Sequence, residues 1–460
     1  MSKIADIVAQ ISADIEAGRL APGQRLPSIR TAQAHLGVSK NTVIEGYARL
    51  AAMGLVDPRR GAGVFVARRT ATKTPPSPAP PPHLAEAVDR ISLLNEQVDQ
   101  TFQLRPGDGR PPQAWMKSAL PSTLKGNILA HFDGDQTAYG RAFGHLPLRE
   151  IIAARMRQIG IQAAPEQIVT TFGANHALDL VIRRFLEPGD TVLVDDPGYY
   201  PLIAKLKLAR IDVIGVARDG DGPNLAQLEA LARLHRPKMF FTQSTCHNPT
   251  GSSMSLPVAH GVLRVAAICA MIVIDNDPFT DLPGNTGTRL AALDQFNSVI
   301  TISTYSKLLS ASFRVGYMTC APGIAREMAE LKLVTTINSS RFSELIITEL
   351  IRSRRYLRHL DQLACRIDEA RAAYLLRVQA MGLTPAAQQE FGYYSFLRLP
   401  DRVDERALAR SAAEAGIFLA PGRLFYCGDA APFPAMRVNV ARAGDARFYR
   451  FLARAIDHAD

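Results

Sequence analysis

The chain has 460 residues, of which 47% are hydrophobic and 21% are charged, and its formal charge is +10. This length exceeds what one compact core usually supports, so we expect two or three domains. The sequence has no secretory signal and no apolar stretch long enough to span a bilayer. The five cysteines are scattered and form no C-x-x-C pair, which argues against a disulfide framework or a zinc site. We expect a cytoplasmic protein with no membrane partner and no metal.

Half of the excess positive charge lies in residues 1–69, which contain two Lys and eight Arg against three Asp and two Glu. A basic module suggests a polyanionic partner, although basic charge by itself is more often a solvated surface.

Three short helices are predicted in this basic segment. Residues 4–15 carry apolar side chains at helical spacing, and Gly18 ends that helix. Ser28 is placed to cap a second helix that stops at Gly37, and residues 41–53 form the third.

A small hairpin is predicted at residues 54–66, with Arg59, Arg60 and Gly61 at its tip. Such a tip suits a minor groove, whereas the short polar and cationic groups that begin the third helix suit a major groove. Those helix-start residues are Ser39, Lys40, Asn41 and Thr42.

Residues 1–67 resemble the winged helix-turn-helix of the GntR family. The resemblance rests on Gly18-Arg19-Leu20-x-Pro22-Gly23-x-Arg25-Leu26-Pro27-Ser28-x-Arg30, Leu36-Gly37-Val38-Ser39-x-Asn41-Thr42-Val43 and Gly61-x-Gly63-x-Phe65-Val66. It implies that operator DNA is approached by Arg30, Ser39, Lys40, Thr42 and Gly61, to which their exposed neighbours Asn41 and Arg60 are added. A protein-interaction module is the alternative, and the joint match of three motifs disfavours it.

Residues 70–83 are predicted to be a linker between a DNA-binding domain at 1–69 and a second domain at 84–460. Six of the eight residues from Pro75 to Pro82 are proline, which favours polyproline II at roughly 3.1 Å per residue. A semi-rigid strut is a better interpretation than an SH3-type ligand.

The second domain alternates strands and helices, which predicts a doubly wound, mostly parallel sheet. Strands are expected at 167–171, 190–195, 239–243, 272–275 and 299–303, and helices at 174–185, 201–208 and 258–269. Ligands of such sheets bind at the carboxyl ends of the strands.

The last of these strands leads to Lys307, which stands among hydroxyl groups and is followed by Arg314. A buried lysine with cationic neighbours has a lowered pKa and can attack an aldehyde. Hydroxyl and guanidinium groups bind phosphate. The pattern suits a Schiff base with a phosphate-bearing cofactor, although most lysines beside serines are solvated.

Other candidate site residues follow the earlier strands. Gly173-Ala174-Asn175 opens a helix whose amides can bind phosphate, Tyr199 offers an aromatic face, and Asn248 begins an Asn-Pro-Thr-Gly turn. Glycine turns and loop tyrosines are commonly structural, and His247 is also better interpreted as structural. Arg437 lies in an apolar strand, where a buried arginine needs an anionic partner.

In this order and spacing the motifs resemble fold type I pyridoxal phosphate enzymes, specifically class I aminotransferases, over roughly residues 100–455. The resemblance implies a mixed, mostly parallel α/β sheet, a smaller C-terminal α/β subdomain and the cofactor pyridoxal 5'-phosphate. Lys307 would form the internal aldimine, Asn248 would bind the phenolic oxygen, Tyr199 would stack on the ring and Arg437 would take the substrate carboxylate. Phosphate would be bound by Gly173, Ala174, Asn175, Thr304, Ser306 and Arg314, with Tyr139 from the partner subunit.

One position departs from this family. The aspartate that pairs with the pyridine nitrogen aligns with Asn276, between Asp275 and Asp277. A carboxylate keeps that nitrogen protonated and makes the ring an electron sink. Either the register differs by one residue and an aspartate such as Asp275 serves, or the sink is weakened.

A GntR-type winged helix linked to an aminotransferase-like domain is the layout of the MocR subfamily of transcription regulators. The resemblance implies a homodimer with swapped domains that binds operator DNA and senses an amine or amino acid through an aldimine at Lys307. The alternative is an active aminotransferase with an appended DNA-binding domain; a sensor of pyridoxal phosphate itself is a third interpretation. The linker, the basic N-terminus and Asn276 favour the regulator, with at most residual transaminase activity.

Overall fold

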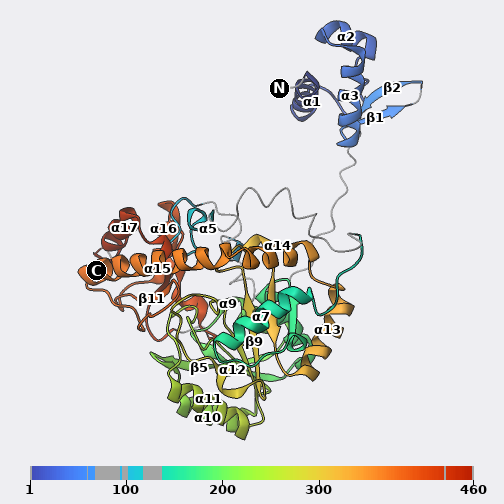
Figure 1. The fold of residues 1–460 in the computed structure, drawn as a ribbon. Helices are drawn as coiled ribbons and strands as arrows, with labels where there is room; N and C mark the ends of the chain where they lie inside the picture. Colours follow the sequence, from blue (N-terminus) through green and yellow to red (C-terminus); the bar gives the residue numbers. More distant parts are fainter. Residues whose placement is uncertain are drawn as a thin grey trace. The chain divides into compact units, whose positions relative to one another are not determined.

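The computed structural model describes residues 3–59, 61–67, 94–95, 102–117, 137–428 and 431–457. The chain divides into two compact units, Met1–Ala79 and Pro80–Asp460, which Figure 1 shows in sequence colours. The predicted linker at 70–83 and Arg60 lie outside the described residues, so the predicted domain boundaries remain predictions.

The first unit contains the three predicted helices and the hairpin. They are α1 (Lys3–Glu16), α2 (Ile29–Leu36), α3 (Lys40–Ala52), β1 (Val56–Arg59) and β2 (Gly63–Val66). Ser28 Oγ accepts from the amide of Thr31 at the start of α2, and Gly37 ends that helix at φ 60°. Local capping chemistry therefore defines α2 as the sequence predicted.

The core of this unit lies between α3 and its neighbours. Val43 and Leu50 on α3 are fully buried, and the Tyr47 hydroxyl donates to Pro27 O at 3.0 Å. Gly46 lets α1 approach closely, because a Cβ there would lie 3.1 Å from Ile7. This packing leaves the first turn of α3 on the surface.

The second unit is built on an eight-stranded sheet of order β3-β10-β9-β8-β7-β4-β5-β6. The strands are β3 (Ile168–Thr171), β4 (Thr191–Asp196), β5 (Asp212–Asp219), β6 (Gly222–Pro223), β7 (Met239–Thr242), β8 (Ile272–Asn276), β9 (Val299–Thr304) and β10 (Gly316–Thr319). Strands β9, β8, β7, β4 and β5 pair in parallel, whereas β10 runs antiparallel to both β3 and β9. The mixed, mostly parallel sheet is thus confirmed.

Helices cover both faces of this sheet. The described helices between residues 113 and 380 are α5 (Gln113–Met116), α7 (Leu146–Gln158), α8 (Ala174–Phe185), α9 (Tyr200–Leu208), α10 (Leu225–His235), α11 (Leu256–Ile268), α12 (Leu290–Asp294), α13 (Pro322–Thr336), α14 (Arg341–Arg352) and α15 (Arg355–Ala380). Val192 and Val194 pack in the cluster that contains α8, α9 and α13, while Leu193 between them packs in the cluster of the opposite face. Because helices cover both faces of these strands, successive residues along a strand are apolar whichever face they point to.

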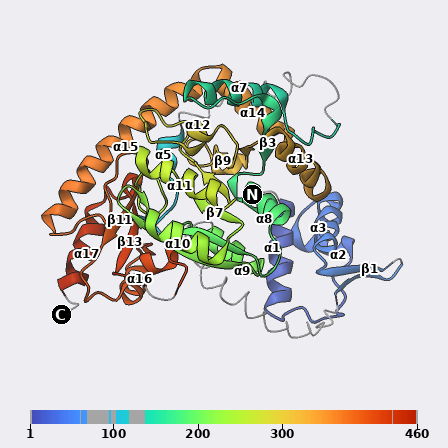
Figure 2. The ribbon, with the colours of Figure 1, turned by 90° about the horizontal axis from the view of Figure 1, so that it is seen from below.

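A smaller antiparallel sheet follows the long helix α15, which arches along the edge of the unit in Figure 2. Its strands are β11 (Tyr394–Arg398), β12 (Ala420–Pro421) and β13 (Ala435–Asn439), and its helices are α16 (Glu405–Glu414) and α17 (Ala446–Asp457). This is the predicted C-terminal subdomain, and β13 carries Arg437. Among the helices described, none combines the length and apolarity needed to cross a membrane.

Candidate functional site

Except for Tyr139, the candidate residues of the second unit gather at the edge of the large sheet where its parallel strands end, and Arg437 reaches this edge from β13. Strand β9 leads to Lys307, whose Nζ donates to Gly109 O at 2.8 Å. Burial lowers the pKa of the Lys307 amine to about 8, and the charge of Arg437 acts in the same direction. A substantial fraction of the amine is therefore neutral and nucleophilic at mildly alkaline pH, where an unperturbed lysine is still protonated.

A cradle for an anion lies between β3 and the turn after Lys307. Gly173 at φ 80° starts α8, and a Cβ there would lie 3.1 Å from Arg314. Arg314, exposed and itself held by Phe172 O at 2.8 Å, reaches this helix start. The first amides of a helix have no partner within it, so those of Ala174 and Asn175 face a site that suits phosphate.

The two hydroxyl residues that the sequence predicts to bind phosphate, Thr304 and Ser306, lie in the turn before Lys307. Thr304 Oγ1 donates to Ser306 Oγ at 3.0 Å and accepts from the Ser306 amide at 3.2 Å. The side chains of Thr304 and Ser306 therefore stabilise the turn that precedes Lys307.

Arg437 and Asn248 meet on the other side of the site. Arg437 is buried, and its guanidinium donates to Asn248 Oδ1 at 3.1 Å and to Gly107 O at 2.7 Å. The rings of Tyr394 and Phe425 lie 5.2 and 5.1 Å from it. In the described part of the structure its Nε has no hydrogen-bond partner, so this cation has unused capacity for an anionic ligand.

Tyr199 completes the wall of the site after β4. Burial raises the pKa of its phenol, and the neighbouring charge of Lys307 opposes that rise. The two side chains thus lie near each other, as the predicted ring-stacking position of Tyr199 requires.

Strand alternation separates Asn276 from the two flanking aspartates. Asp275 accepts from the amide and the hydroxyl of Ser244 at 2.9 and 2.7 Å, and Asp277 pairs with Arg289 at 3.1 Å. Asn276 faces the opposite way, toward a small cavity shared with Tyr199. Its Oδ1 is buried and has no partner among the described residues.

Gln243 is a site residue that sequence reasoning missed. Its Nε2 donates to Asn276 O at 2.9 Å, and its Oε1 accepts from the Asn248 amide at 2.8 Å. One side chain therefore joins the two asparagines that the sequence singled out. Gln243 follows β7 and Asn276 ends β8, so the contact joins residues that are far apart in the sequence. No local motif could therefore have identified Gln243.

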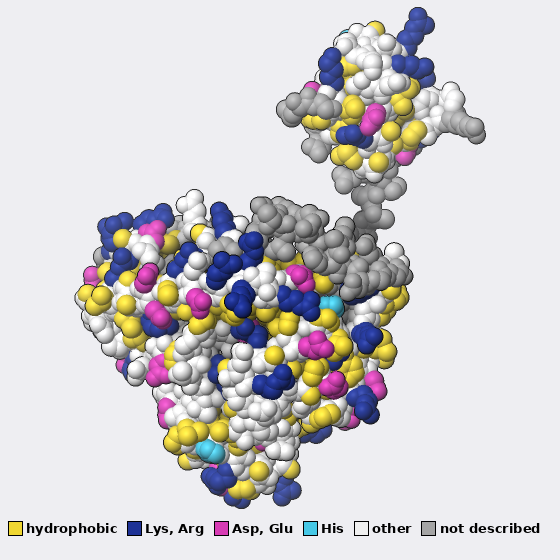
Figure 3. Space-filling model, in the orientation of Figure 1, with side chains coloured by type: hydrophobic (Ala, Val, Ile, Leu, Met, Phe, Trp, Pro, Cys, Tyr) yellow, Lys and Arg dark blue, Asp and Glu magenta, His cyan; other side chains and the backbone are white. Residues whose placement is uncertain are grey.

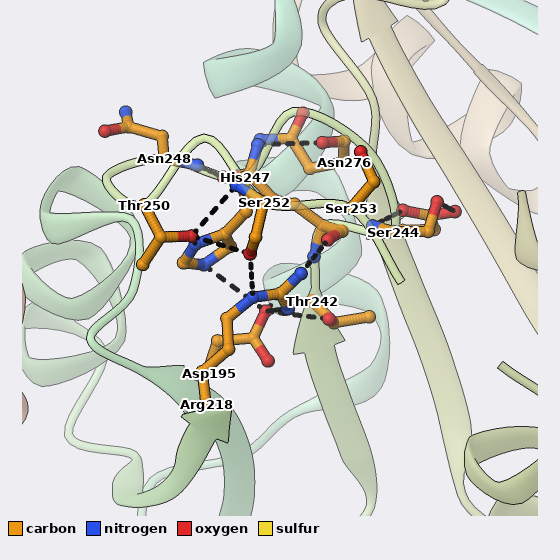
Figure 4. A network of polar contacts seen from close by, with 12 residues as sticks. Asp195, Arg218, Thr242, Ser244, His247, Asn248, Thr250, Ser252, Ser253 and Asn276 are labelled. Carbon is orange, nitrogen blue, oxygen red and sulfur yellow. Dashed lines mark hydrogen bonds and ion pairs between the residues drawn. The ribbon is translucent and has the colours of Figure 1, made fainter. Parts of the chain in front are cut away.

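A buried polar network holds the Asn248 turn from below, as Figure 4 shows. Arg218 pairs with Asp195 at 3.0 Å and donates to Ser252 Oγ at 3.3 Å. His247 is fully buried and its Nδ1 lies 2.8 Å from Thr250 Oγ1. Burial holds the pKa of the imidazole well below its usual value, so His247 is neutral, and its contact with Thr250 is compatible with the structural role that the sequence predicts.

Residues 107–110 form a second feature that the sequence did not reveal. Carbonyl groups of this loop accept from Arg437, Lys307 and, at 2.9 Å from Gly109 O, the Tyr394 hydroxyl. These contacts link positions more than 190 residues apart, which no spacing pattern encodes.

Tyr139 does not join the Lys307 group within the described part of this chain. It is 79% exposed and lines a separate hollow with His145 and Arg341. Its predicted role toward a partner subunit stays a prediction.

The predicted DNA contacts of the first unit lie on its surface. Arg30, Lys40 and Asn41 are exposed, whereas Ser39 Oγ caps α3 by accepting from the Thr42 amide at 3.2 Å. Gly61 turns the hairpin at φ 76°. Figure 3 shows several Lys and Arg side chains projecting from this unit, together with a few acidic ones.

Comparisons with known proteins agree with both units. The profile of the family described as Aminotransferase class I and II matches residues 104–456, and that of Bacterial regulatory proteins, gntR family, matches residues 3–66. The HTH-type transcriptional regulator YdcR of Escherichia coli is 29% identical over 93% of each chain. TauR of Rhodobacter capsulatus, another HTH-type transcriptional regulator, is 28% identical over 90% of this chain and 88% of its own.

Solved aminotransferases share the fold of the second unit. Kynurenine aminotransferase of Pyrococcus horikoshii, solved with PMP, has a TM-score of 0.73 and 24% identity, covering 80% of this chain and 94% of its own. LysN of Thermus thermophilus has a TM-score of 0.72 and 24% identity, covering 81% and 97%.

The fold and the matched domains define a fold type I chain with an N-terminal winged helix. The protein belongs to the Aminotransferase class I and II family. Its gntR-type helix-turn-helix precedes that domain, which is the architecture of the MocR subfamily.

Proposed function

We propose that the protein is a pyridoxal phosphate-dependent transcription regulator that binds operator DNA and senses an amine or amino acid at Lys307. It would act in the cytoplasm as a homodimer with swapped domains. The order of the two domains supports this proposal, as do relatives of nearly the same length that are described as transcriptional regulators.

The residues around Lys307 fit pyridoxal phosphate. Arg314 and the start of α8 would hold its phosphate, Tyr199 its ring and Asn248 its phenolic oxygen. When bound, the cofactor supplies an aldehyde that combines reversibly with primary amines. Arg437 would orient an incoming amino acid by its carboxylate.

Asn276 is the observation that favours a sensor over a catalyst. Its side chain lines a small cavity with Tyr199, and by the family resemblance this is where a carboxylate would keep a pyridine nitrogen protonated. Asp275 and Asp277 bond instead to Ser244 and Arg289. A neutral amide stabilises a protonated ring poorly, so removal of a proton from the ligand's α-carbon would be slow. Amine binding does not need that charge.

An active aminotransferase is the second candidate, because Lys307, Asn248 and Arg437 are all at the site. In that case ligand binding would be followed by rapid conversion. The two functions therefore differ in what happens to the amino acid after it binds.

The decisive experiment measures operator affinity of the full chain with and without a panel of amino acids. Wild type should absorb in the visible range when loaded with cofactor, and at least one amine should change both the spectrum and the operator affinity. Lys307→Ala should lose the band and the response while keeping DNA binding. An unchanged band in this variant, or operator affinity that no amine alters, would contradict the proposal.

A further inference from the structure

The hairpin of the first unit has an arginine on each side of β2. Residues 23–26 run antiparallel to β2 and are joined to it by backbone hydrogen bonds of 2.8 to 2.9 Å. In this pairing Arg25 stands opposite Phe65. On the other side of β2, Arg59 of β1 stands opposite Gly63. The middle strand is therefore flanked by two cations that come from separate segments.

Both arginines lie on the outer face of the hairpin. Residues opposite each other in a sheet share a face, as do residues two apart along a strand. The other face carries Val56 and Val66, which are each 2% exposed and belong to the core formed with α3. Arg25 and Arg59 are exposed, so their face of the hairpin is turned toward solvent.

Each arginine reaches across to β2, where an uncharged residue holds it. A Cβ at Gly63 would lie only 2.9 Å from Arg25 Nε, so the end of the Arg25 side chain fills the space that Gly63 leaves open. The guanidinium carbon of Arg59 lies 4.7 Å from the centre of the Phe65 ring, which is a cation–π contact. Gly63 and Phe65 are two residues apart, or roughly 7 Å along the strand. The two guanidinium groups therefore lie as a pair over β2.

No described ion pair neutralises either guanidinium. In the described part of this unit, Arg19 pairs with Asp14 at 2.7 Å. Arg49 pairs with Glu45 at 3.0 Å. Asp57 lies on the same face as the two arginines and belongs to no described ion pair. Two like charges that uncharged groups hold side by side on a surface favour an anionic partner.

We propose that Arg25 and Arg59 form a phosphate clamp, which binds the sugar-phosphate backbone of DNA beside the hairpin tip. This inference rests on the proposed function, in which Gly61 at the tip approaches the operator. The gntR-family match covers both arginines, and Arg59 is two residues from Gly61. Arginine binds phosphate oxygens through parallel N–H groups. Contacts to phosphates position a protein on DNA without reading bases, so the clamp adds affinity and orientation rather than sequence selectivity.

The salt dependence of DNA binding tests the phosphate clamp in the full-length protein. The probe is a mixed-sequence DNA duplex, because a phosphate contact does not need the operator sequence, and binding is followed by fluorescence anisotropy over a series of salt concentrations. Each phosphate contact contributes about 0.9 to the slope of log K against log salt. Arg25→Gln and Arg59→Gln should each reduce that slope by about one and weaken binding roughly tenfold at low salt.

Two further variants separate the clamp from the effect of net charge. Phe65→Leu removes the ring that holds Arg59 and should weaken binding although it removes no charge. Arg19→Gln is the matched control: it removes a cation whose side chain is 65% exposed in the same unit and should leave the slope unchanged. Thermal unfolding followed by circular dichroism confirms that each variant is folded at the temperature of the assay.

Equal losses in Arg19→Gln and Arg25→Gln would show that only net charge matters and would overturn the inference. A slope that neither Arg25→Gln nor Arg59→Gln changes, in a protein that still binds DNA, would also overturn it and leave the proposed function standing. Wild-type protein that fails to bind duplex DNA even at low salt would instead contradict the proposed function, and the inference would fall with it.

Discussion

Asn276→Asp tests the proposal that Asn276 stands where the ring nitrogen of the cofactor would lie. Asn276 is 8% exposed and faces the site, and its Oδ1 has no partner among the described residues. An aspartate of nearly the same shape would place a carboxylate where the ring nitrogen of pyridoxal phosphate is expected. We expect the variant to hold that nitrogen protonated and to transaminate faster than wild type.

The magnitude follows from Coulomb's law. Opposite unit charges 4 Å apart interact by about 4 kcal/mol at an effective dielectric constant of 20. Since one pKa unit corresponds to about 1.4 kcal/mol, the ring-nitrogen pKa should rise by up to about 3 units. Without cofactor the new carboxylate is buried and unpaired, which should lower the stability of the variant until cofactor binds.

Ring protonation is measured by nitrogen NMR of labelled cofactor across pH, and conversion is followed by single-turnover absorbance with an amino acid. Asp275→Asn is the matched control: it removes a carboxylate that bonds Ser244 and should leave the ring nitrogen unchanged. A ring nitrogen that is already protonated in wild type would refute the assignment of Asn276 to this position, and its loss of that proton in Asp275→Asn would assign the role to Asp275.

Two further predictions concern DNA binding and pH. Arg30→Ala and Lys40→Ala should each weaken operator binding by roughly 1–3 kcal/mol if they make specific contacts, and affinity should fall steeply with salt. Arg49→Ala on α3, where Arg49 pairs with Glu45 at 3.0 Å, is the control; equal losses in all three variants, or salt-independent binding, would contradict the orientation of α3. Because burial lowers the pKa of Lys307 to about 8 and only the neutral amine attacks, the rate of cofactor capture by the apoprotein should rise as pH rises through 8 and level off above. Stopped-flow absorbance measures this rate, and a rise confined to pH above 10 would show that the amine is not perturbed.

Elements with local signals were predictable from the sequence. The predicted helix at 174–185 coincides with α8, since Gly173 and a run of apolar residues at helical spacing define it. Ser28 and Gly37 likewise defined α2. Lys307, Asn248 and Arg437 were found because distinctive short motifs surround them.

Contacts between distant segments were not predictable in this way. Gln243 joins Asn248 to Asn276 across two strands, and Asp108, in the loop near residue 110, lies 3.6 Å from Arg442, more than 300 residues further along the chain. The sequence also left open which of Asp275, Asn276 and Asp277 faces the site, because this depends on the contacts that each side chain makes in the fold. Only the pairing of Asp275 with Ser244 and of Asp277 with Arg289 shows which side chains are already committed.

The two ends of the site differ in charge, and this difference bears on signalling. Around Lys307, the buried guanidinium of Arg437 favours a ligand with an anionic group, whereas the end at Asn276 is neutral. Binding depends on the first property and chemical conversion on the second. A ligand that binds tightly and is released unchanged can couple reciprocally to operator affinity, because linkage requires an equilibrium between bound and free ligand. Rapid conversion would instead deplete the signal. With Asn276 facing the ring nitrogen, as we propose, the site suits a regulator more than an enzyme.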